Sequence, residues 1–403
     1  MRPSQFKRAV VASVVVSGAV NGLNILITND DGFGTANIRE LYKAIKAYGH
    51  QAYIVASSSN QSGMGGITTY AGSKNLTADT EFGKPLSHEK FRIEDSHTHQ
   101  IGIVKAGAPS IGPDPNDSHV WYFNGTPSAC VQVGLDYVLP RHANFSVPDL
   151  VLSGPNYGLN LGPFLYTLAG TLGATYTAVE RGIPAIGYSG GYSIQTAYYH
   201  VNETTAAGLQ DPATIYGQLA ADLAQQLITN VAANGGGRLL PFGYGINVNI
   251  PYITSFTNDS CISPPFVLSR MTGGAVVDKA VYNETTGLFR YGDVVTEGLN
   301  TCINGDCTLP GETDVLAEGC RSSVSVFTVD YDAPVVGECG GVDVRGLLRP
   351  LVGSVNFTAR GNGTVGGGAA VLSPVTSAVG KNSVSWTNIA GVVGLMVCVV
   401  FGL

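Results

Sequence analysis

The chain of 403 residues carries little charge. Only 13% of its residues are Asp, Glu, Lys or Arg, which is about half the share typical of globular proteins. The net charge of −7 leaves no basic footprint, so we expect no nucleic-acid polymer as a partner. No internal repeat is present. Low charge together with 53 glycines and many Ser, Thr and Asn residues is typical of a secreted glycoprotein.

The two ends of the chain are typical of targeting segments. Basic residues followed by the apolar run 9–20 form the pattern of a secretory signal; a buried first helix is the alternative. The apolar run 389–403 is short for a membrane span, and small residues and a polar spacer precede it, as in a GPI-anchor signal; a short tail anchor is the alternative. We therefore expect a secreted protein of the cell surface or cell wall, attached to the membrane through a lipid. The predicted parts are a signal peptide (1–20), a catalytic domain (24–345), a Gly/Ser/Thr-rich stalk (346–388) and the anchor signal (389–403).

Glycosylation sequons and cysteines agree with an extracellular location. Sequons occur at Asn75, Asn116, Asn144, Asn202, Asn258, Asn283, Asn356 and Asn362, and also at Asn60 and Asn124, where we expect no glycan. Five of the seven cysteines cluster between Cys261 and Cys339, which predicts disulfides in an oxidising compartment. Cys302 and Cys307 are spaced to close a small loop. Cys130 lies in an apolar helical pattern and is expected to be a buried thiol.

The stretch around residues 24–34 carries the clearest chemical signal. An apolar run ends in Asn29, Asp30, Asp31 and Gly32, the pattern of a buried parallel strand that delivers two carboxylates to its carboxyl end. Adjacent carboxylates repel each other, and burying them is costly unless they are paired or bind a metal. Oxygen ligands of this kind suit Mg²⁺, Mn²⁺ or Ca²⁺. Asn, Asp and Gly are also common turn residues, so a plain turn is the alternative.

Hydrophobic periodicity predicts an α/β fold. Apolar residues recur with helical spacing over 36–48, and an apolar strand pattern follows at 51–56, so the two predict a βαβ unit and a parallel sheet. A polar excursion is expected at 71–118 and a β-rich, cysteine-bearing segment at 252–345. The other expected elements are strands at 121–123, 149–153, 182–188, 244–251 and 323–329 and helices at 129–139, 169–181 and 212–231.

Glycine-rich or polar loops follow several of these predicted strands. Residues 57–66 follow the second strand, and residues 154–162 follow the strand at 149–153. A Ser or Asn side chain in these loops would complete an oxygen site beside Asp30 and Asp31. Gly170 and Thr171 then open a helix, and free N–H groups at a helix start favour a bound anion. Ordinary surface loops are the alternative interpretation.

Several separated segments, taken together in order, resemble the SurE-like phosphatase/nucleotidase family. The matching segments are 25–32, 55–56, 60–63, 124–127, 130–131, 148–156, 158–162, 170–171, 247–251, 313–314 and 318–319. The resemblance implies a Rossmann-like three-layer α/β sandwich with a mainly parallel sheet and a β-rich C-terminal extension. It also implies a metal-dependent phosphomonoesterase of the acid phosphatase or nucleotidase type. Secreted members of the family tend to be described as acid phosphatases.

Carried over residue by residue, the resemblance assigns a site. It makes Asp30 and Asp31 the catalytic metal-binding carboxylates and Ser62 and Asn156 the remaining ligands of one divalent ion, Mg²⁺ or Mn²⁺. Residues expected to bind the substrate phosphate are Asn29, Asn156, Gly170 and Thr171. The implied substrate is a small phosphate monoester such as a nucleoside monophosphate, and the family's habit of exchanging C-terminal segments implies a homodimer.

The sequence departs from the family pattern at two positions. Ala169 stands where the family usually has a serine, and Thr167 is the nearest hydroxyl that could replace it. Pro155 replaces the middle residue of the family's Gly-Ile-Asn and removes an N–H donor. These departures favour a second hypothesis, a GPI-anchored surface glycoprotein that keeps the fold but has impaired catalysis. A nucleotide-binding transferase is a third, weakened because no Gly-x-Gly-x-x-Gly follows the first strand.

Overall fold

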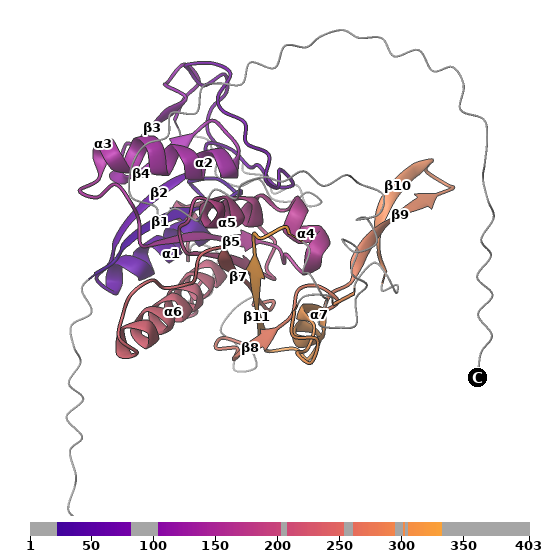
Figure 1. Cartoon of the computed structure of the whole chain (residues 1–403). Helices are drawn as coiled ribbons and strands as arrows, with labels where there is room; N and C mark the ends of the chain where they lie inside the picture. Colours follow the sequence, from indigo (N-terminus) through magenta and orange to yellow (C-terminus); the bar gives the residue numbers. More distant parts are fainter. Residues whose placement is uncertain are drawn as a thin grey trace, which may run out of the picture. The chain divides into compact units, whose positions relative to one another are not determined.

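The structure is a computed structural model that describes residues 22–81, 104–202, 208–253, 261–294, 301–302 and 305–332 (Figure 1). The predicted signal peptide, stalk and anchor signal lie outside the described residues, as does Cys339. Among the helices that the structure describes, none is both long enough and apolar enough to cross a membrane.

A nine-stranded sheet forms the centre of the described residues. Its order is β3 (Ile111–Asp114), β4 (Asp117–Phe123), β2 (Gln51–Ser57), β1 (Asn24–Thr28), β5 (Leu150–Tyr157), β6 (Ala185–Gly190), β7 (Tyr244–Ile250), β11 (Ser322–Thr328) and β8 (Phe266–Ser269). The six strands from β4 to β7 are mutually parallel, whereas β3 and β11 run antiparallel to their inner neighbours. The predicted, mainly parallel α/β sheet is therefore confirmed.

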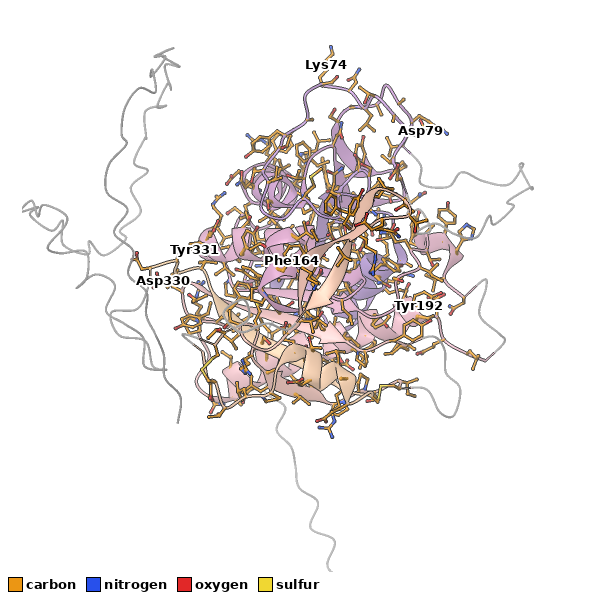
Figure 2. All side chains as sticks on the ribbon, turned by 90° about the vertical axis from the view of Figure 1, so that its right-hand side faces the viewer. Lys74, Asp79, Phe164, Tyr192, Asp330 and Tyr331 are labelled. Atoms are coloured by element: carbon orange, nitrogen blue, oxygen red, sulfur yellow. A yellow bond between two sulfur atoms is a disulfide. The ribbon has the colours of Figure 1, made fainter. Side chains whose placement is uncertain are left out.

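Helices cover both faces of this sheet, which gives the predicted three layers (Figure 1). Alternate residues of β1 separate two hydrophobic cores, because successive side chains of a strand point to opposite faces. Ile25 and Ile27 pack with α1 and α6, while Leu26 packs with α2 and α5. Side chains fill the space between the layers (Figure 2). The helices are α1 (Ala36–Ala47), α2 (Pro127–Val133), α3 (Leu139–His142), α4 (Gly162–Leu168), α5 (Gly170–Glu180), α6 (Pro212–Ala233) and α7 (Glu312–Ala317), with a π-helical turn at Gly134–Val138.

The sheet has a topological switch point between β1 and β5. These two strands are hydrogen-bonded neighbours. The chain leaves β1 toward α1 on one face and leaves β5 toward α5 on the other. Ligands of open α/β sheets bind in the crevice at the carboxyl ends of the strands at such a point. The topology therefore places the end of β1, with its acidic pair, in the expected binding position.

The connection after β6 passes back along the carboxyl-terminal edge of the sheet, toward the end of β1, before it enters α6. Helices α1 and α6 share a face, although their connections run in opposite directions across the sheet. The β1–α1–β2 and β6–α6–β7 crossovers therefore have opposite handedness. One of the two departs from the rule that crossovers between parallel strands are right-handed. Residues 191–200 make this return, and the backbone of Thr196 and Tyr198 hydrogen-bonds Ala36 and Gly34 beside the end of β1. This return brings an additional segment to the switch point.

Several elements differ from the sequence-based prediction in their bounds. Helix α2 begins at Pro127 with Thr126 as its N-cap residue, rather than after Ser128, because proline at the first helical position sacrifices no hydrogen bond. Strand β3 lies inside the segment expected to be a polar excursion. The C-terminal part is β-rich as predicted, but β8 and β11 join the main sheet, and β9 (Val277–Asn283) and β10 (Leu288–Val294) pair separately.

The described cysteines agree with the prediction. Cys302 pairs with Cys307, and Cys261 pairs with Cys320. Cys130 is a buried thiol in α2, and burial raises its pKa to about 12.

Candidate active site

The acidic turn after β1 is held by the side chain of Asn29. The Asn29 amide donates to the Gly32 carbonyl and to Thr35 Oγ1, each at 3.2 Å, and its oxygen accepts from the Gly32 N–H at 3.2 Å. Gly32 has a φ of +112°, which an L side chain rarely adopts. Asn29 therefore shapes the turn that presents Asp30 and Asp31. Its expected contact with substrate stays a prediction.

Asp30 lies against the start of α5. Thr171 Oγ1 donates to Asp30 Oδ1 at 2.5 Å, and backbone hydrogen bonds from Gly170 and Thr171 also reach this carboxylate. The structure thus brings together three residues that the sequence assigned to one site. It also shows that the N–H groups expected to hold phosphate already face a carboxylate, which a helix start favours electrostatically.

Asp31 is held through both of its carboxylate oxygens. The Tyr157 N–H at the end of β5 donates to Oδ2 at 3.2 Å, and Gln195 Nε2 donates to Oδ1 at 2.5 Å. Asp30 is 2% exposed and Asp31 is fully buried. Two buried carboxylates on adjacent residues therefore occupy the switch point.

Burial and mutual repulsion disfavour two negative charges at this position. Desolvation raises the pKa of Asp30 above its usual range, although the hydrogen bonds from Thr171 and Gly170 oppose the shift. Desolvation also raises the pKa of Asp31 well above its usual range, and the charge of Asp30 adds to this shift. A bound cation would offset both effects, because it returns the favourable electrostatic interactions that the carboxylates lose on leaving water. The pair therefore fits a metal site.

Ser62 belongs to a loop that is tied to the acidic turn. The Gln61 N–H donates to the Asp30 carbonyl oxygen at 2.7 Å. Asn60 Oδ1 accepts from the Ser62 N–H at 2.8 Å, and Ser62 itself is exposed. The structure brings the loop to the expected edge, while the coordination assigned to the Ser62 hydroxyl stays a prediction.

The same loop packs closely against α5. A Cβ on Gly173 would lie 1.8 Å from the Gly65 carbonyl oxygen, so only glycine permits this approach of two backbones. The contact fixes the polar loop after β2 relative to the helix that hydrogen-bonds Asp30.

Asn156 lies near the carboxyl end of β5 and is largely buried. Its amide donates to the Gly158 carbonyl at 2.8 Å, which leaves its oxygen as the group suited to a cation. The Gly154–Pro155 peptide bond before it is cis, and the pairing of β5 with β6 shifts register between Ser153 and Asn156. The assignment of Asn156 as a ligand stays a prediction.

Ala169 follows the last residue of α4 and is the N-cap residue of α5, and its side chain makes no capping hydrogen bond. The hydroxyl of Thr167 is exposed and donates to the Phe164 carbonyl at 2.8 Å within α4. The hydroxyl that reaches the acidic pair is that of Thr171.

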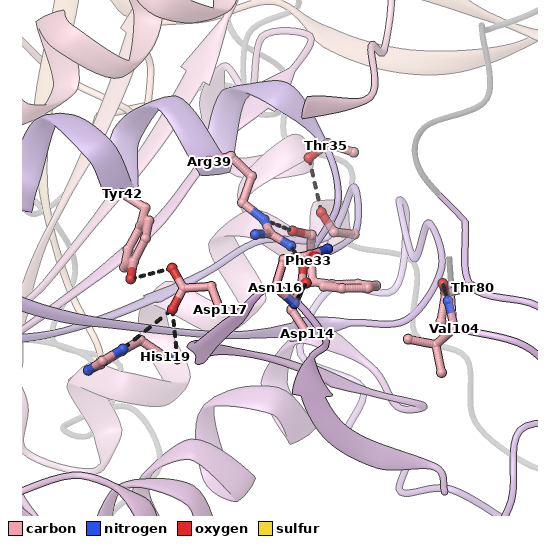
Figure 3. A network of polar contacts seen from close by, with 11 residues as sticks. Phe33, Thr35, Arg39, Tyr42, Thr80, Val104, Asp114, Asn116, Asp117 and His119 are labelled. Atoms are coloured by element: carbon pink, nitrogen blue, oxygen red, sulfur yellow. Dashed lines mark hydrogen bonds and ion pairs between the residues drawn. The ribbon is translucent and has the colours of Figure 1, made fainter. Parts of the chain in front are cut away.

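A buried ion pair supports the turn from the side of α1 (Figure 3). The Arg39 guanidinium pairs with Asp114, and its Nε donates to the Phe33 carbonyl at 2.6 Å. The guanidinium also lies 4.5 Å from the centre of the Tyr198 ring, a cation–π contact with the returning segment. Arg39 therefore links the acidic turn, the β3 edge and the connection after β6.

The sequence did not predict Gln195 or the Tyr157 N–H as parts of the site. Neither follows a recognisable motif, and Gln195 reaches Asp31 across 164 residues of chain. The one sequence feature that could have indicated an additional segment at the site is the length of the connection between β6 and α6. A direct crossover from β6 to α6 would need fewer residues.

The chemistry of the buried carboxylate pair suits a hard, hydrated cation. Within the part of the chain that the structure describes, no group of three or more His, Cys, Asp or Glu side chains is placed to bind a metal. A pair of carboxylates is compatible with Mg²⁺, which is usually bound by one or two carboxylates together with substrate phosphates.

Fold and site together define a doubly wound α/β protein with a buried pair of carboxylates at its topological switch point. The model of the family described as "Survival protein SurE" matches residues 25–264. This match shows that the chain belongs to the SurE family.

Similar proteins carry related names. An acid phosphatase from Yarrowia lipolytica (strain CLIB 122 / E 150) is 42% identical over 313 residues, covering 77% of this chain and 80% of that protein. A 5'-nucleotidase SurE from Methanocella arvoryzae is 32% identical over 232 residues, covering 56% of this chain and 66% of that protein. Among solved structures, the SurE protein from Aquifex aeolicus has a TM-score of 0.45 and 21% identity over 76% of this chain and 94% of that chain.

Proposed function

We propose that this protein is a metal-dependent phosphomonoesterase of the acid phosphatase or 5'-nucleotidase type. The observation that carries the proposal is the pair Asp30 and Asp31, both buried at the switch point of a SurE-family fold. The names of its relatives, acid phosphatase and 5'-nucleotidase, support phosphate monoesters as the substrate class. The proposed substrates are small monoesters such as nucleoside monophosphates.

In this proposal, Asp30 and Asp31 hold one divalent ion, Mg²⁺ or Mn²⁺, and Asn156 and Ser62 complete its protein ligands. When bound, such an ion polarises the phosphoryl oxygens and offsets the charge that develops on them. Thr171 and the start of α5 keep the Asp30 carboxylate oriented through hydrogen bonds. The Tyr157 N–H and Gln195 do the same for Asp31. These contacts hold the two carboxylates at the switch point, where the proposal places the phosphate.

Hydrolysis of p-nitrophenyl phosphate and of AMP by the purified protein tests the proposal. Activity is expected with Mg²⁺ or Mn²⁺ and should disappear on chelation. Asp31→Asn should lower kcat/KM at least 100-fold, because it removes a charge that holds the ion. Asp222→Asn in α6 is the matched control and should keep wild-type activity. Full activity of the Asp31→Asn variant, or activity that chelation leaves unchanged, contradicts the metal assignment.

The alternative is the surface glycoprotein with impaired catalysis. It is supported by Ala169, which contributes no hydroxyl or capping bond at the start of α5. A folded protein that hydrolyses neither substrate with either metal would favour this alternative.

We further propose that the protein works outside the cytosol, at the cell surface, with a lipid anchor. The two disulfides support an oxidising compartment, as do the sequons. Enzymatic removal of N-glycans should increase the gel mobility of the protein from its native host, and a phosphatidylinositol-specific phospholipase should release it from the surface. A full-length protein recovered from the cytosol without glycans would contradict the location. The homodimer stays a prediction that the mass of the protein in solution can test.

A further inference from the structure

Gln195 lies between the acidic turn and the loop that carries Ser62. We propose that Gln195 is a positioning residue that fixes the Asp31 carboxylate for the cation and couples it to the Ser62 loop. The inference rests on the proposed function, because it assumes that Asp31 binds a divalent ion. It adds a residue from a segment to which neither sequence motif nor family resemblance gave a role.

The Gln195 side chain uses both ends of its amide. Nε2 donates to Asp31 Oδ1 at 2.5 Å, and Oε1 accepts from Asn60 Nδ2 at 3.3 Å. Gln195 is only 5% exposed, so these contacts form out of water, where a lost hydrogen bond is costly. The two contacts need a donor and an acceptor on one side chain, and the glutamine amide supplies both without charge at any pH.

The backbone around Gln195 is anchored to the segment that follows the acidic pair. The Ala36 N–H donates to the Thr196 carbonyl at 2.8 Å, and the Tyr198 N–H donates to the Gly34 carbonyl at 3.0 Å. Thr35 and Ala197 form an isolated antiparallel bridge. These contacts fix the Gln195 backbone relative to Asp31, so the side chain meets the carboxylate in a defined position.

The Gln195 contact completes the support of the Asp31 carboxylate. The Tyr157 N–H already donates to Oδ2, and Gln195 donates to Oδ1, so the plane of the carboxylate is set by donors on β5 and on the returning segment. Each oxygen keeps a lone pair for a cation. Partners of this kind orient metal ligands, and their loss typically costs about 10–100-fold in metal affinity or activity.

Gln195 also connects two predicted ligands through Asn60. Asn60 donates to Gln195 through Nδ2 and accepts from the Ser62 N–H through Oδ1 at 2.8 Å. The polar path runs from Asp31 through Gln195 and Asn60 to Ser62. Displacement of Gln195 therefore affects both the carboxylate and the loop after β2. Asn60 Nδ2 lies against the buried Gln195 side chain, which agrees with the expectation that the sequon at Asn60 carries no glycan.

Gln195→Met tests the inference, because methionine keeps the length of the side chain but cannot donate a hydrogen bond. Gln226→Met, at an exposed position of α6, is the matched control. Mn²⁺ binding to the full chain is measured from the electron paramagnetic resonance signal of the free ion, which requires no catalysis. Gln195→Met should weaken Mn²⁺ binding about 10–100-fold. Its melting temperature without metal reports separately on folding, and Gln226→Met should bind as the wild type does.

Asp31→Asn, measured in the same way, separates this inference from the proposed function. Weaker Mn²⁺ binding by both Asp31→Asn and Gln195→Met supports the two together. Weaker binding by Asp31→Asn alone, with Gln195→Met within twofold of the wild type, overturns the positioning role and leaves the function standing. Unchanged binding by Asp31→Asn overturns the metal assignment and the inference with it.

A second variant covers the case in which Gln195→Met does not fold. Asn60→Ser keeps an oxygen that can accept from the Ser62 N–H in a serine turn but is too short to reach Gln195. It should weaken Mn²⁺ binding at least threefold. Binding equal to that of the wild type would again overturn the coupling.

Discussion

Gly170 lies so close to Asp30 that a side chain on Gly170 has no room. A Cβ at this position would stand 2.8 Å from Asp30 Cβ, 3.1 Å from Asp30 Oδ2 and 2.9 Å from Pro127 Cγ. The φ of Gly170 is not in the left-handed region, so the glycine is required by the contact and not by the backbone conformation. The close contact is what allows the first N–H groups of α5 to reach the carboxylate.

Gly170→Ala should therefore damage the site more than the fold. The added methyl group must displace either the Asp30 carboxylate or the start of α5, and a displacement near 1 Å costs about 100-fold in rate. We expect kcat/KM to fall between about 10- and 100-fold and the free energy of unfolding to fall by about 1–3 kcal/mol. Steady-state kinetics and urea unfolding measure the two effects.

Gly72→Ala is the control for this substitution, because a Cβ on Gly72 meets nothing within 4 Å. Its activity and stability should match those of the wild type. A Gly170→Ala enzyme with wild-type kcat/KM would show that the position of the Asp30 carboxylate is not critical for catalysis.

Breaking the buried ion pair of Arg39 and Asp114 should lower the free energy of unfolding more than breaking an exposed ion pair. The side chains of Arg39 and Asp114 are 7% and 0% exposed. Figure 3 shows the two residues within their network of polar contacts. Arg39→Met leaves the Asp114 carboxylate buried without its partner, and such losses cost about 3–5 kcal/mol. Urea unfolding should show this decrease in the free energy of unfolding.

Lys105→Met is the comparison, because Lys105 pairs with Asp79 in an exposed position, and Asp79 projects outward in Figure 2. Exposed pairs contribute little, so Lys105→Met should leave the unfolding midpoint almost unchanged. Equal effects of the two substitutions would contradict the argument that burial decides the contribution.

The sequence predicted the acidic pair because two strong patterns coincide there. An apolar run that ends in Asp30 and Asp31 identifies a strand and its carboxyl edge, and α1 follows with clear helical spacing. Parallel strands bring their carboxyl ends to one edge, so the loop with Ser62 and the end of β5 with Asn156 were expected nearby. Local periodicity and topology indicated where these residues lie, whereas the resemblance to the SurE-like family gave them their roles as metal ligands.

The contacts that orient Asp30 and Asp31 depend on the tertiary path of the chain. Hydrophobic periodicity predicts helices and strands but not this path. Gln195 reaches Asp31 only because the connection after β6 returns over the edge of the sheet. The role of Thr171 is comparable: its position at the start of α5 was predicted, but its hydroxyl partner Asp30 was not. Strand β3 was missed because Pro113 and Gly112 are typical of turns, whereas an edge strand tolerates them.

A buried glutamate links the C-terminal part of the sheet to the segment after the site. Glu312 is fully buried at the start of α7. Its Oε2 accepts from the Gly162 N–H at 2.7 Å, where α4 begins, and its Oε1 accepts from Asn247 Nδ2 at 3.0 Å. Ser325 on β11 also hydrogen-bonds Glu312. Burial outweighs these hydrogen bonds and raises the pKa of Glu312 to about 7.

This raised pKa predicts how stability depends on pH. In the folded state Glu312 keeps its proton up to about pH 7, whereas in the unfolded state it loses the proton near its ordinary pKa of 4.5. Its contribution to stability is therefore complete below pH 4.5 and is lost as the pH rises to 7, with a total of about 3 kcal/mol. Glu312→Gln cannot titrate, so its free energy of unfolding should change less between pH 4.5 and pH 7.5 than that of the wild type. Urea unfolding at a series of pH values measures the difference, with the exposed Glu284→Gln as control. Parallel pH profiles for Glu312→Gln and the wild type would show that Glu312 does not carry this proton in the folded state.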